Sequence, residues 1–187
     1  MKKTNLTIKY KRRRYGQTNY TNRLGMLKSG VPRLVIRKSL KNINVQIVKY
    51  EPDGDKVLFS SNSKQLAKYG WKYSRSNVPA AYLTGLLCAK KSKNVGETIL
   101  DVGQASMTKG NSILSALKGS VDGGLKVMHS EDLFPETQRI TGSHIAKFAD
   151  QAKDYPNQNS GYKKKGIDAK NIEKDFADVK KKILGEK

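Results

Sequence analysis

The first 50 residues of the chain carry fourteen lysines and arginines and no aspartate or glutamate; the first acidic residue is Glu51. The other 137 residues hold 23 basic and 16 acidic side chains, so two thirds of the net charge of +21 belongs to the first 50 residues. Because this segment has no acidic residue to neutralise its charge, its cations repel one another, and binding to a polyanion would stabilise its compact state. Basic N-terminal segments of this kind commonly bind nucleic acids.

Aromatic residues are interleaved with this charge. Tyr10, Tyr15 and Tyr20 lie around the basic run at residues 11–14 (KRRR), which places rings for stacking on bases beside cations for phosphates. Residues 1–17 have few apolar side chains, and we expect them to form an extended basic arm. The charge continues through segments with the pattern of regular structure, at Arg23, Lys28, Arg33, Arg37 and Lys41. A nuclear-localisation run or a solvated tail, the alternatives for a basic segment, would not require this continuation.

Length and composition limit the class of protein. A chain of 187 residues, 36% of them apolar, can form one domain of about 150 residues with extensions, or at most two small domains. The single cysteine, Cys88, excludes an internal disulfide and a cysteine-rich zinc site. No apolar run approaches the roughly 18 residues of a membrane span, and the N-terminus lacks the apolar core of a secretion signal. We therefore expect a soluble, intracellular protein that does not bind membranes.

The first third of the chain has the pattern of a helix followed by strands. A helix is predicted over residues 18–29, with Thr18 as N-cap and Gly30 at its end. Apolar or alternating runs predict the three strands of an antiparallel meander, at residues 34–36, 45–50 and 57–59. Residues 52–55 (PDGD) form the turn before the third strand, because proline fixes φ and glycine permits positive φ.

Helical periodicity is stronger in the rest of the chain. Helices are predicted to begin at Asn77, after Asn111 and at Thr141, and a core strand at residues 98–103. Residues 155–166 have the composition of a linker. After the N-cap candidate Asp168, a four–three–four spacing predicts one apolar helix face that must pack against another part of the protein, at Ile172, Phe176, Val179 and Ile183.

These elements predict an α/β fold. A three-stranded antiparallel meander continues into a mixed sheet with packed helices, because the fourth strand follows a helical crossover. A basic N-terminal arm precedes this domain and a helical C-terminal extension follows it. The predicted boundaries are residues 1–17 for the basic RNA-binding arm, 18–154 for the α/β domain, and 155–187 for the linker and C-terminal helix.

No motif for nucleotide or metal binding is complete. Residues 119–126 come nearest to a phosphate-binding loop, but Leu125 stands where the lysine is required and the segment follows a predicted helix. His129 and His144 are isolated histidines, and Cys88 lies on an apolar helix face, where a core position is the simplest interpretation. We expect no metal, no cofactor and no small-molecule substrate.

Catalysis has equally little support. Nucleophilic catalysis needs a base beside the nucleophile and a third, orienting group, and the chain contains no nucleophile-elbow motif. A metal-dependent nuclease would need several acids at one sheet edge, and Asp101 is the one candidate, at the end of a predicted strand. A structural loop or cap role for Asp101 is the alternative. We expect that the protein is not an enzyme.

The order and spacing of several motifs resemble a family of large-subunit ribosomal proteins, number eighteen in the universal nomenclature. The resemblance is carried by residues 28–37 (KSGVPRLVIR) with Ser39, Lys41 and Gln46, then by 69–71 (YGW), 77–85 (NVPAAYLTG), 100–103 (LDVG), 110–111 (GN) and 142–146 (GSHIA). It covers about residue 10 to at least residue 150. The YGW and NVPAAYLTG motifs are specific to the archaeal and eukaryotic branch of the family.

This resemblance implies a structural protein of the cytoplasmic ribosome that binds 5S rRNA in the central protuberance and helps to anchor it to 23S rRNA. It also implies neighbouring large-subunit proteins as partners, including the universal fifth-family protein, and no catalytic residue or cofactor. Carried onto matching positions, it predicts RNA contacts from Lys11, Arg12, Arg13, Arg14, Tyr20, Arg23, Lys28, Arg33, Arg37, Ser39, Lys41, Asn42 and Gln46. The sequence departs from the family pattern at Leu40, where a polar residue is usual, and at Asn42, where His or Tyr is frequent.

Three other functions would also use a basic α/β protein. One is an RNA-processing nuclease that depends on a metal and on Asp101. The second is a free DNA- or tRNA-binding module, and the third is a basic globular protein that binds polyanions without discrimination. The resemblance and the concentration of charge in the first 50 residues favour ribosomal RNA binding over all three.

Overall fold

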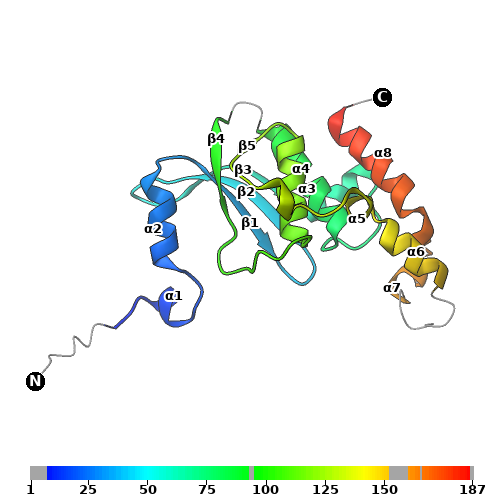
Figure 1. Cartoon of the computed structure of the whole chain (residues 1–187), viewed down its shortest axis with the longest axis horizontal. Coiled ribbons are helices and arrows are strands. Elements are labelled where there is room, and N and C mark those ends of the chain that lie inside the picture. The colour runs from blue at the N-terminus through cyan, green and yellow to red at the C-terminus, as the bar shows by residue number, and fades with distance from the viewer. Residues whose placement is uncertain (1–7, 93–94, 152–159, 165, 186–187) are drawn as a thin grey trace, which may run out of the picture.

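The computed structural model describes residues 8–92, 95–151, 160–164 and 166–185 (Figure 1). The strands are β1 (Arg33–Lys38), β2 (Ile43–Lys49), β3 (Lys56–Asn62), β4 (Glu97–Asp101) and β5 (Lys126–Val127). The helices are α1 (Lys11–Arg14), α2 (Tyr20–Lys28), α3 (Val78–Lys91), α4 (Ser112–Asp122), α5 (Thr137–Thr141), α6 (Ser143–Gln151), α7 (Ser160–Lys163) and α8 (Ile172–Leu184), with the short 3-10 helices η1 (Ser63–Tyr69), η2 (Glu131–Leu133) and η4 (Ala169–Asn171). Within these ranges, no helix has the length and apolar content needed to cross a membrane.

The strands form one mixed sheet in the order β3-β2-β1-β4-β5. The pairs β1–β2 and β2–β3 are antiparallel, while β1–β4 and β4–β5 are parallel. The parallel pair β1–β4 requires a crossover, which α3 provides. The predicted α/β fold, a meander that continues into a mixed sheet with packed helices, is therefore confirmed.

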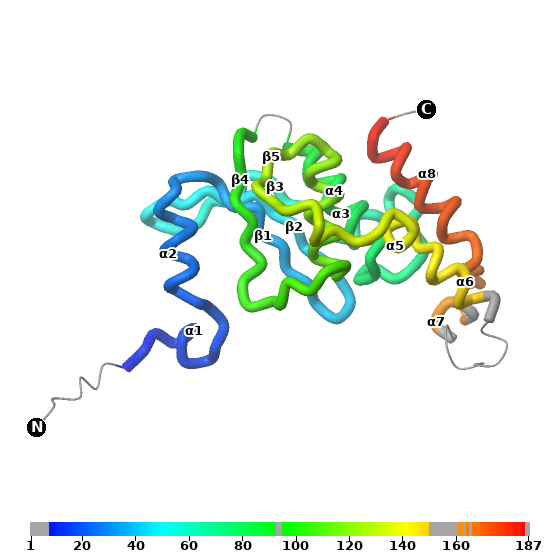
Figure 2. Tube along the Cα trace, viewed as in Figure 1, coloured from blue at the N-terminus to red at the C-terminus, as the bar shows by residue number. Residues whose placement is uncertain are grey.

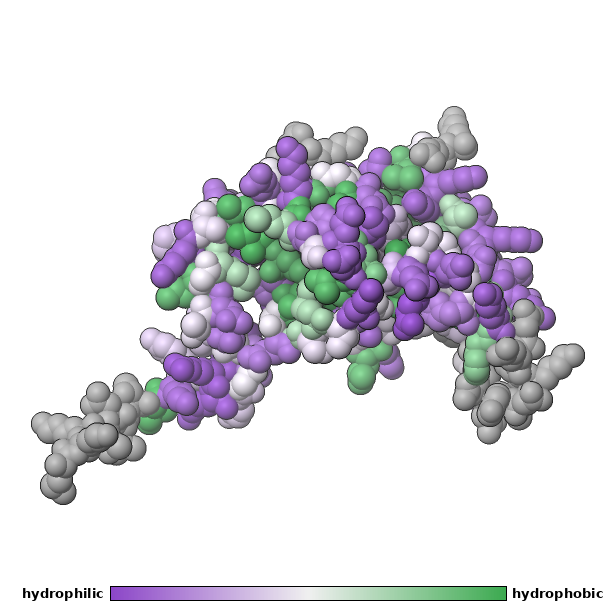
Figure 3. Space-filling model, in the orientation of Figure 1, coloured by the Kyte–Doolittle hydropathy of each residue, from purple (hydrophilic) through white to green (hydrophobic). Residues whose placement is uncertain are grey.

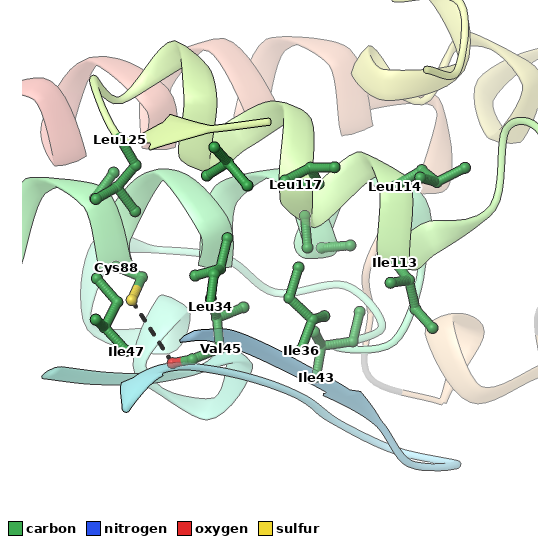
Figure 4. Packing of buried hydrophobic residues seen from close by; sticks show 14 residues of the cluster. Leu34, Ile36, Ile43, Val45, Ile47, Cys88, Ile113, Leu114, Leu117 and Leu125 are labelled. Atoms are coloured by element: carbon green, nitrogen blue, oxygen red, sulfur yellow. Dashed lines mark hydrogen bonds between the residues drawn. The ribbon is translucent and has the colours of Figure 1, made fainter. Parts of the chain in front are cut away.

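One face of the sheet carries the first hydrophobic core. Side chains of β1 and β2 alternate, and those on the covered face pack against α3 and α4, as Figure 4 shows for Leu34, Ile36, Ile43, Val45, Ile47, Cys88, Ile113, Leu114 and Leu117. Cys88 is a fully buried core residue, as predicted, and its Sγ lies 3.7 Å from the Val45 carbonyl oxygen. Burial raises the pKa of this thiol to about 11.

A second core joins the C-terminal extension to the domain. All four residues of the predicted apolar face of α8 are buried, against a cluster that includes Leu66, Trp71, Leu83 and Ile140. The Tyr82 and Phe176 rings lie 5.6 Å apart, and the Tyr73 hydroxyl donates a hydrogen bond to Asp175 at 3.0 Å. The prediction that this helix packs against another part of the protein is confirmed, and its partners are α3, α5, α6 and η1.

Helices α3 and α4 cross at two glycines. A Cβ on Gly119 would overlap the carbonyl oxygen of Tyr82, and one on Gly85 would overlap the carbonyl oxygen of Ala116. Because both obstacles are backbone atoms, we expect Gly119→Ala to destabilise the protein by at least about 2 kcal/mol, measured as a lower urea midpoint.

Gly25→Ala is the matched control. Gly25 lies inside α2, and a methyl group added there would have open space around it, with no neighbouring atom within 4 Å. Since alanine favours helix over glycine by about 0.5–1 kcal/mol, this variant should be equally or more stable than the wild type. Equal midpoints for the Gly119 and Gly25 variants would show that the helices do not cross as closely as described.

Several element boundaries differ from the sequence-based predictions. Residues 11–14 form a single helical turn inside the segment predicted to be extended; lysine and arginine favour helix, and Gly16 stops it with φ +62°. Asn19, not Thr18, caps α2: its side chain accepts hydrogen bonds from the backbone N–H groups of Thr21 and Asn22. The Thr18 hydroxyl instead accepts a hydrogen bond from Arg12.

The helix predicted to begin at Thr141 is present as α6, but its predicted start is wrong. Thr141 ends α5, and α6 begins at Ser143, because Gly142 adopts φ +95° and separates the two helices. The predicted linker contains the short helix α7, and some of its residues lie outside the described ranges. The two-residue strand β5, the 3-10 helices η1 and η2, and α5 were not predicted, whereas Asp168 caps η4 as expected.

Candidate nucleic-acid interface

The face of the sheet opposite α3 and α4 carries polar and basic side chains. Leu34 and Ile36 of β1 point into the core, so Arg33, Val35 and Arg37 lie on the other face. Their register partners on β2, which share this face, are Val48, Gln46 and Asn44. Gln46 donates a long hydrogen bond of 3.4 Å to Ser60 on β3, so the polar surface continues onto the third strand. We call this the open face of the sheet.

Helix α2 and the chain before it lie beside the open face. A cavity of about 640 Å³ separates them from the sheet, and its lining includes Arg12, Arg23, Arg37, Lys38 and Gln46. The lining combines cations with amide and hydroxyl groups, which are suited to phosphate and sugar oxygens. The fold thus brings together residues from the arm, α2, β1 and β2.

The described part of the arm, from residue 8 onward, folds back onto the start of α2. The Arg12 Nε donates to the Thr18 hydroxyl at 2.9 Å, and the rings of Tyr10 and Tyr20 lie 5.7 Å apart. Lys11, Arg13 and Arg14 remain exposed. Hydrophilic side chains accordingly gather over α1 (Figure 3). Helices α1 and α8 lie at opposite ends of the molecule (Figure 2).

A chain of ion pairs joins α2 to the open face. Arg23 and Arg33 both donate to Asp55 Oδ2, at 2.8 and 2.7 Å. Arg33 also donates to Asp101 Oδ2 at 2.8 Å, and Arg37 donates to Asp101 Oδ1 at 2.7 Å. The side chains of Arg33 and Asp101 are only 3% and 5% exposed, whereas that of Arg37 is 46% exposed. Arg33 therefore lies behind the surface, while Arg37 remains available to a ligand.

Both acids of this network are held in their charged form. Burial acts to raise the pKa of Asp101, but the hydrogen bond and charge of Arg37, the Gly103 N–H and the charge of Arg33 outweigh it, so the pKa falls below its ordinary 3.8. Burial likewise acts to raise the pKa of Asp55, and its hydrogen bonds and ion pairs with Arg23 and Arg33 lower it overall. Two arginines occupy the Asp101 carboxylate, which is the arrangement of a structural acid and not of a metal ligand.

Other candidate chemistry is also accounted for in the described part of the chain. No group of three or more histidine, cysteine, aspartate or glutamate side chains there could hold a metal ion. The His129 ring packs on Phe134 at 5.0 Å, with its Nδ1 2.7 Å from the Val127 carbonyl oxygen. Gly119 lies inside α4, so the segment that came nearest to a phosphate-binding loop begins within a helix.

The β1–β2 hairpin extends the surface beyond the end of β1. The Ser39 hydroxyl donates to the Asn42 carbonyl oxygen at 2.9 Å and accepts from the Asn42 N–H at 3.0 Å, so both residues hold the turn. Lys41 is exposed at the tip. Lys28 is exposed at the end of α2, and Tyr20 lies at its start. These residues flank the cavity without lining it.

Sequence reasoning missed some residues of this surface. Lys38 lines the cavity and was counted only as part of the charge, although its place beside Arg37 at the end of β1 could have indicated it. Asp55 was placed in a turn, and no local pattern indicates that it pairs with two arginines.

Comparisons with known proteins agree with this architecture. The model of a family described as "Ribosomal large subunit proteins 60S L5, and 50S L18" matches residues 4–97 and 90–130. The large ribosomal subunit protein uL18 of Korarchaeum cryptofilum (strain OPF8) is 43% identical over 181 residues, which cover 94% of this chain and 93% of that protein. The match thus spans the basic arm, the sheet and the C-terminal extension. The chain belongs to the uL18 family of large-subunit ribosomal proteins, in its archaeal form, and is a structural, non-enzymatic constituent of the large subunit of the cytoplasmic ribosome.

Proposed function

We propose that the chain binds 5S rRNA through one continuous surface, made of the basic arm, α2, the open face of the sheet and the β1–β2 hairpin. The observation that carries this proposal is the position of residues 8–50, the described part of the acid-free segment, which form these elements around the side of the sheet that α3 and α4 leave uncovered. The ribosomal family, with its rRNA partners, supports the same assignment.

Binding would rest on phosphate neutralisation and on shape. Each phosphate paired with lysine or arginine releases counterions, so affinity falls with salt by a slope of about −0.7 to −0.9 per contact. Arg13 and Arg14 are exposed and can clamp phosphates with two hydrogen bonds or stack on bases, which lysine cannot do. Because A-form RNA hides its major-groove edges, selectivity would come from loops, unstacked bases and overall shape.

The predicted contact residues then divide into two roles. Lys11, Arg13, Arg14, Lys28, Arg37 and Lys41 would contact RNA, and Arg12, Tyr20, Arg23 and Gln46 would contact it at the border of the cavity. Arg33, Ser39 and Asn42 would act as positioning residues, since Arg33 is buried between two acids and the other two close the hairpin. In this role Arg33 fixes Asp101, which in turn holds Arg37 at the surface.

The proposal includes the place of the complex in the large subunit. The chain would anchor 5S rRNA to 23S rRNA in the central protuberance, beside the universal fifth-family protein. Helix α8 lies at the far end from the arm (Figure 2). Its first turn carries Glu173 and Asp175, but its last turn presents the exposed Lys181 and Lys182, which offer a separate cationic surface for 23S rRNA.

A competition titration tests 5S rRNA binding. Labelled archaeal 5S rRNA bound to the full chain is displaced by unlabelled 5S rRNA, by an unrelated structured RNA of equal length, by tRNA or by duplex DNA. We expect 5S rRNA to compete at least tenfold better than the others at about 0.15 M monovalent salt, where nonspecific charge interactions are weakened. Equal competition by all four would instead indicate a general polyanion-binding protein and would overturn the proposal.

A further inference from the structure

The tip of the β1–β2 hairpin presents an apolar side chain to solvent. Leu40 is 96% exposed, the highest value among the large apolar side chains of the described residues. Isolated apolar residues on a surface are common and by themselves carry no meaning. Leu40 differs from an ordinary exposed apolar residue in two respects: it lies in a hydrogen-bonded turn, and the residues around it are basic.

The support is a closed turn. The Ser39 N–H and hydroxyl both donate to the Asn42 carbonyl oxygen, at 2.8 and 2.9 Å, and the Asn42 N–H donates back to the Ser39 hydroxyl. At the base of the hairpin, the Ile43 N–H donates to the buried Ser63 hydroxyl at 3.0 Å. The backbone of the turn that presents Leu40 is therefore ordered before binding, so fixing it costs little conformational entropy.

The surroundings are basic and contain no acid. Leu40 borders two hollows of about 920 and 470 Å³, and neither is lined by an aspartate or glutamate. The first includes Lys38, and the second includes Lys41, Lys72 and Arg75, with serine hydroxyls in both. Such a rim is complementary to phosphates, whereas a basic protein partner would be repelled by it.

We propose that Leu40 is an apolar wedge that packs against an unstacked base of the RNA, while Lys41, Lys72 and Arg75 bind the flanking phosphates. Apolar side chains such as leucine insert beside bases in other nucleic-acid complexes, where surrounding cations hold the backbone. The inference rests on the proposed function, because the hairpin continues β1 and the open face, and it assigns the wedge to the same 5S rRNA. Leu40, Lys72 and Arg75 thereby join the recognition surface.

Two substitutions at one position test the wedge. Leu40→Ala removes most of the apolar surface, and Leu40→Asn replaces it with a polar side chain. Because burial of a leucine side chain corresponds to about a tenfold change in affinity or more, both variants should bind 5S rRNA about tenfold more weakly. The slope of log affinity against log salt should not change, since no charge is removed. Lys72→Gln, in contrast, removes one phosphate contact, so that slope should become shallower by about 0.7 to 0.9.

Met128→Ala is the matched control. Met128 is 89% exposed, but it precedes the acidic residues Glu131 and Asp132 on another loop. The Met128→Ala variant should bind 5S rRNA with the affinity of the wild type. The Leu40, Lys72 and Met128 variants should all melt at the wild-type temperature, since the three side chains are exposed. If the wild type prefers 5S rRNA and both Leu40 variants bind within twofold of it, the wedge is refuted while the proposed function stands. If the wild type shows no preference, the proposed function itself fails.

Photocrosslinking identifies the occupant in the assembled particle. A benzophenone amino acid replaces Leu40 in the full chain, which is incorporated into large subunits and irradiated. We expect the crosslink to map to a nucleotide of 5S rRNA. A crosslink to 23S rRNA or to a neighbouring protein would overturn the proposal and identify what occupies the hairpin tip instead.

Discussion

Replacing Arg12, Arg13 and Arg14 with glutamine should weaken binding to 5S rRNA by about 100-fold at about 0.15 M salt, because three phosphate contacts are lost. The salt slope should become shallower by about 2 to 3. Both effects follow from counterion release, so they should shrink together as the salt concentration rises. A filter-binding titration at several salt concentrations measures them.

The loss of affinity should depend on where the charge is removed and not on the total charge of the protein. The control replaces three exposed lysines of α8, Lys174, Lys181 and Lys182, with glutamine and removes the same charge from the far end of the molecule. We expect this variant to bind 5S rRNA within a fewfold of the wild type. Similar losses in the two variants would show that net charge alone drives binding.

Deletion of residues 1–17 provides an independent form of the same test. No residue of α1 is buried, so the shortened chain should keep its circular dichroism spectrum and melting temperature. Its affinity for 5S rRNA should fall at least as far as that of the triple variant. Unchanged affinity would refute the role of the arm.

Asp101→Asn should lower the free energy of unfolding by about 3 kcal/mol, because it removes one of the two carboxylates that neutralise the buried Arg33. The urea midpoint measures this loss. RNA affinity should also fall, since Arg37 loses its ion pair and with it a fixed position at the surface. Glu51→Gln is the control, because Glu51 and Lys56 form an exposed pair at 3.9 Å whose loss should cost less than about 0.5 kcal/mol.

The same network makes stability depend on pH in the acid range. The pKa values of Asp101 and Asp55 are depressed in the folded state, so their stabilisation is complete above the unfolded value near 3.9 and is lost as the pH falls through the folded values. Wild-type stability should thus drop below about pH 4, and the Asp101→Asn variant should show a smaller drop. Parallel pH profiles for the two proteins would contradict the ion-pair network.

Local patterns predicted those parts of the fold whose causes are local. Asn77 caps α3 as expected, with a side chain that accepts a hydrogen bond from the Ala80 N–H. Helix α4 follows Asn111 as expected, and the Asn111 side chain accepts a hydrogen bond from the Leu114 N–H. The four–three–four spacing of apolar residues correctly predicted the buried face of α8. The strand β5 has only two residues, which is too short for a periodic signal. The helix η1 has 3-10 geometry, whose period of three residues differs from the α-helical period used for the prediction.

The candidate site was predictable in charge but not in geometry. The concentration of cations before Glu51 is visible in the sequence, whereas the ion pairs that organise them join residues 22 to 68 positions apart. Burial of Arg33 depends on Asp55, in the turn before β3, and on Asp101, at the end of β4, which are brought together only by the sheet. Sequence reasoning therefore grouped Arg33 with exposed cations that it in fact supports from behind.

Lysine protection tests most directly whether this surface binds 5S rRNA. The full chain is acylated with and without saturating 5S rRNA, and the modified lysines are quantified by mass spectrometry. Lys28, Lys38 and Lys41 should become at least several-fold less reactive in the complex, while Lys126, Lys174 and Lys181, which are also exposed, should react as in the free protein. Protection of the second group with continued reactivity of the first would mean that the RNA binds elsewhere on the protein.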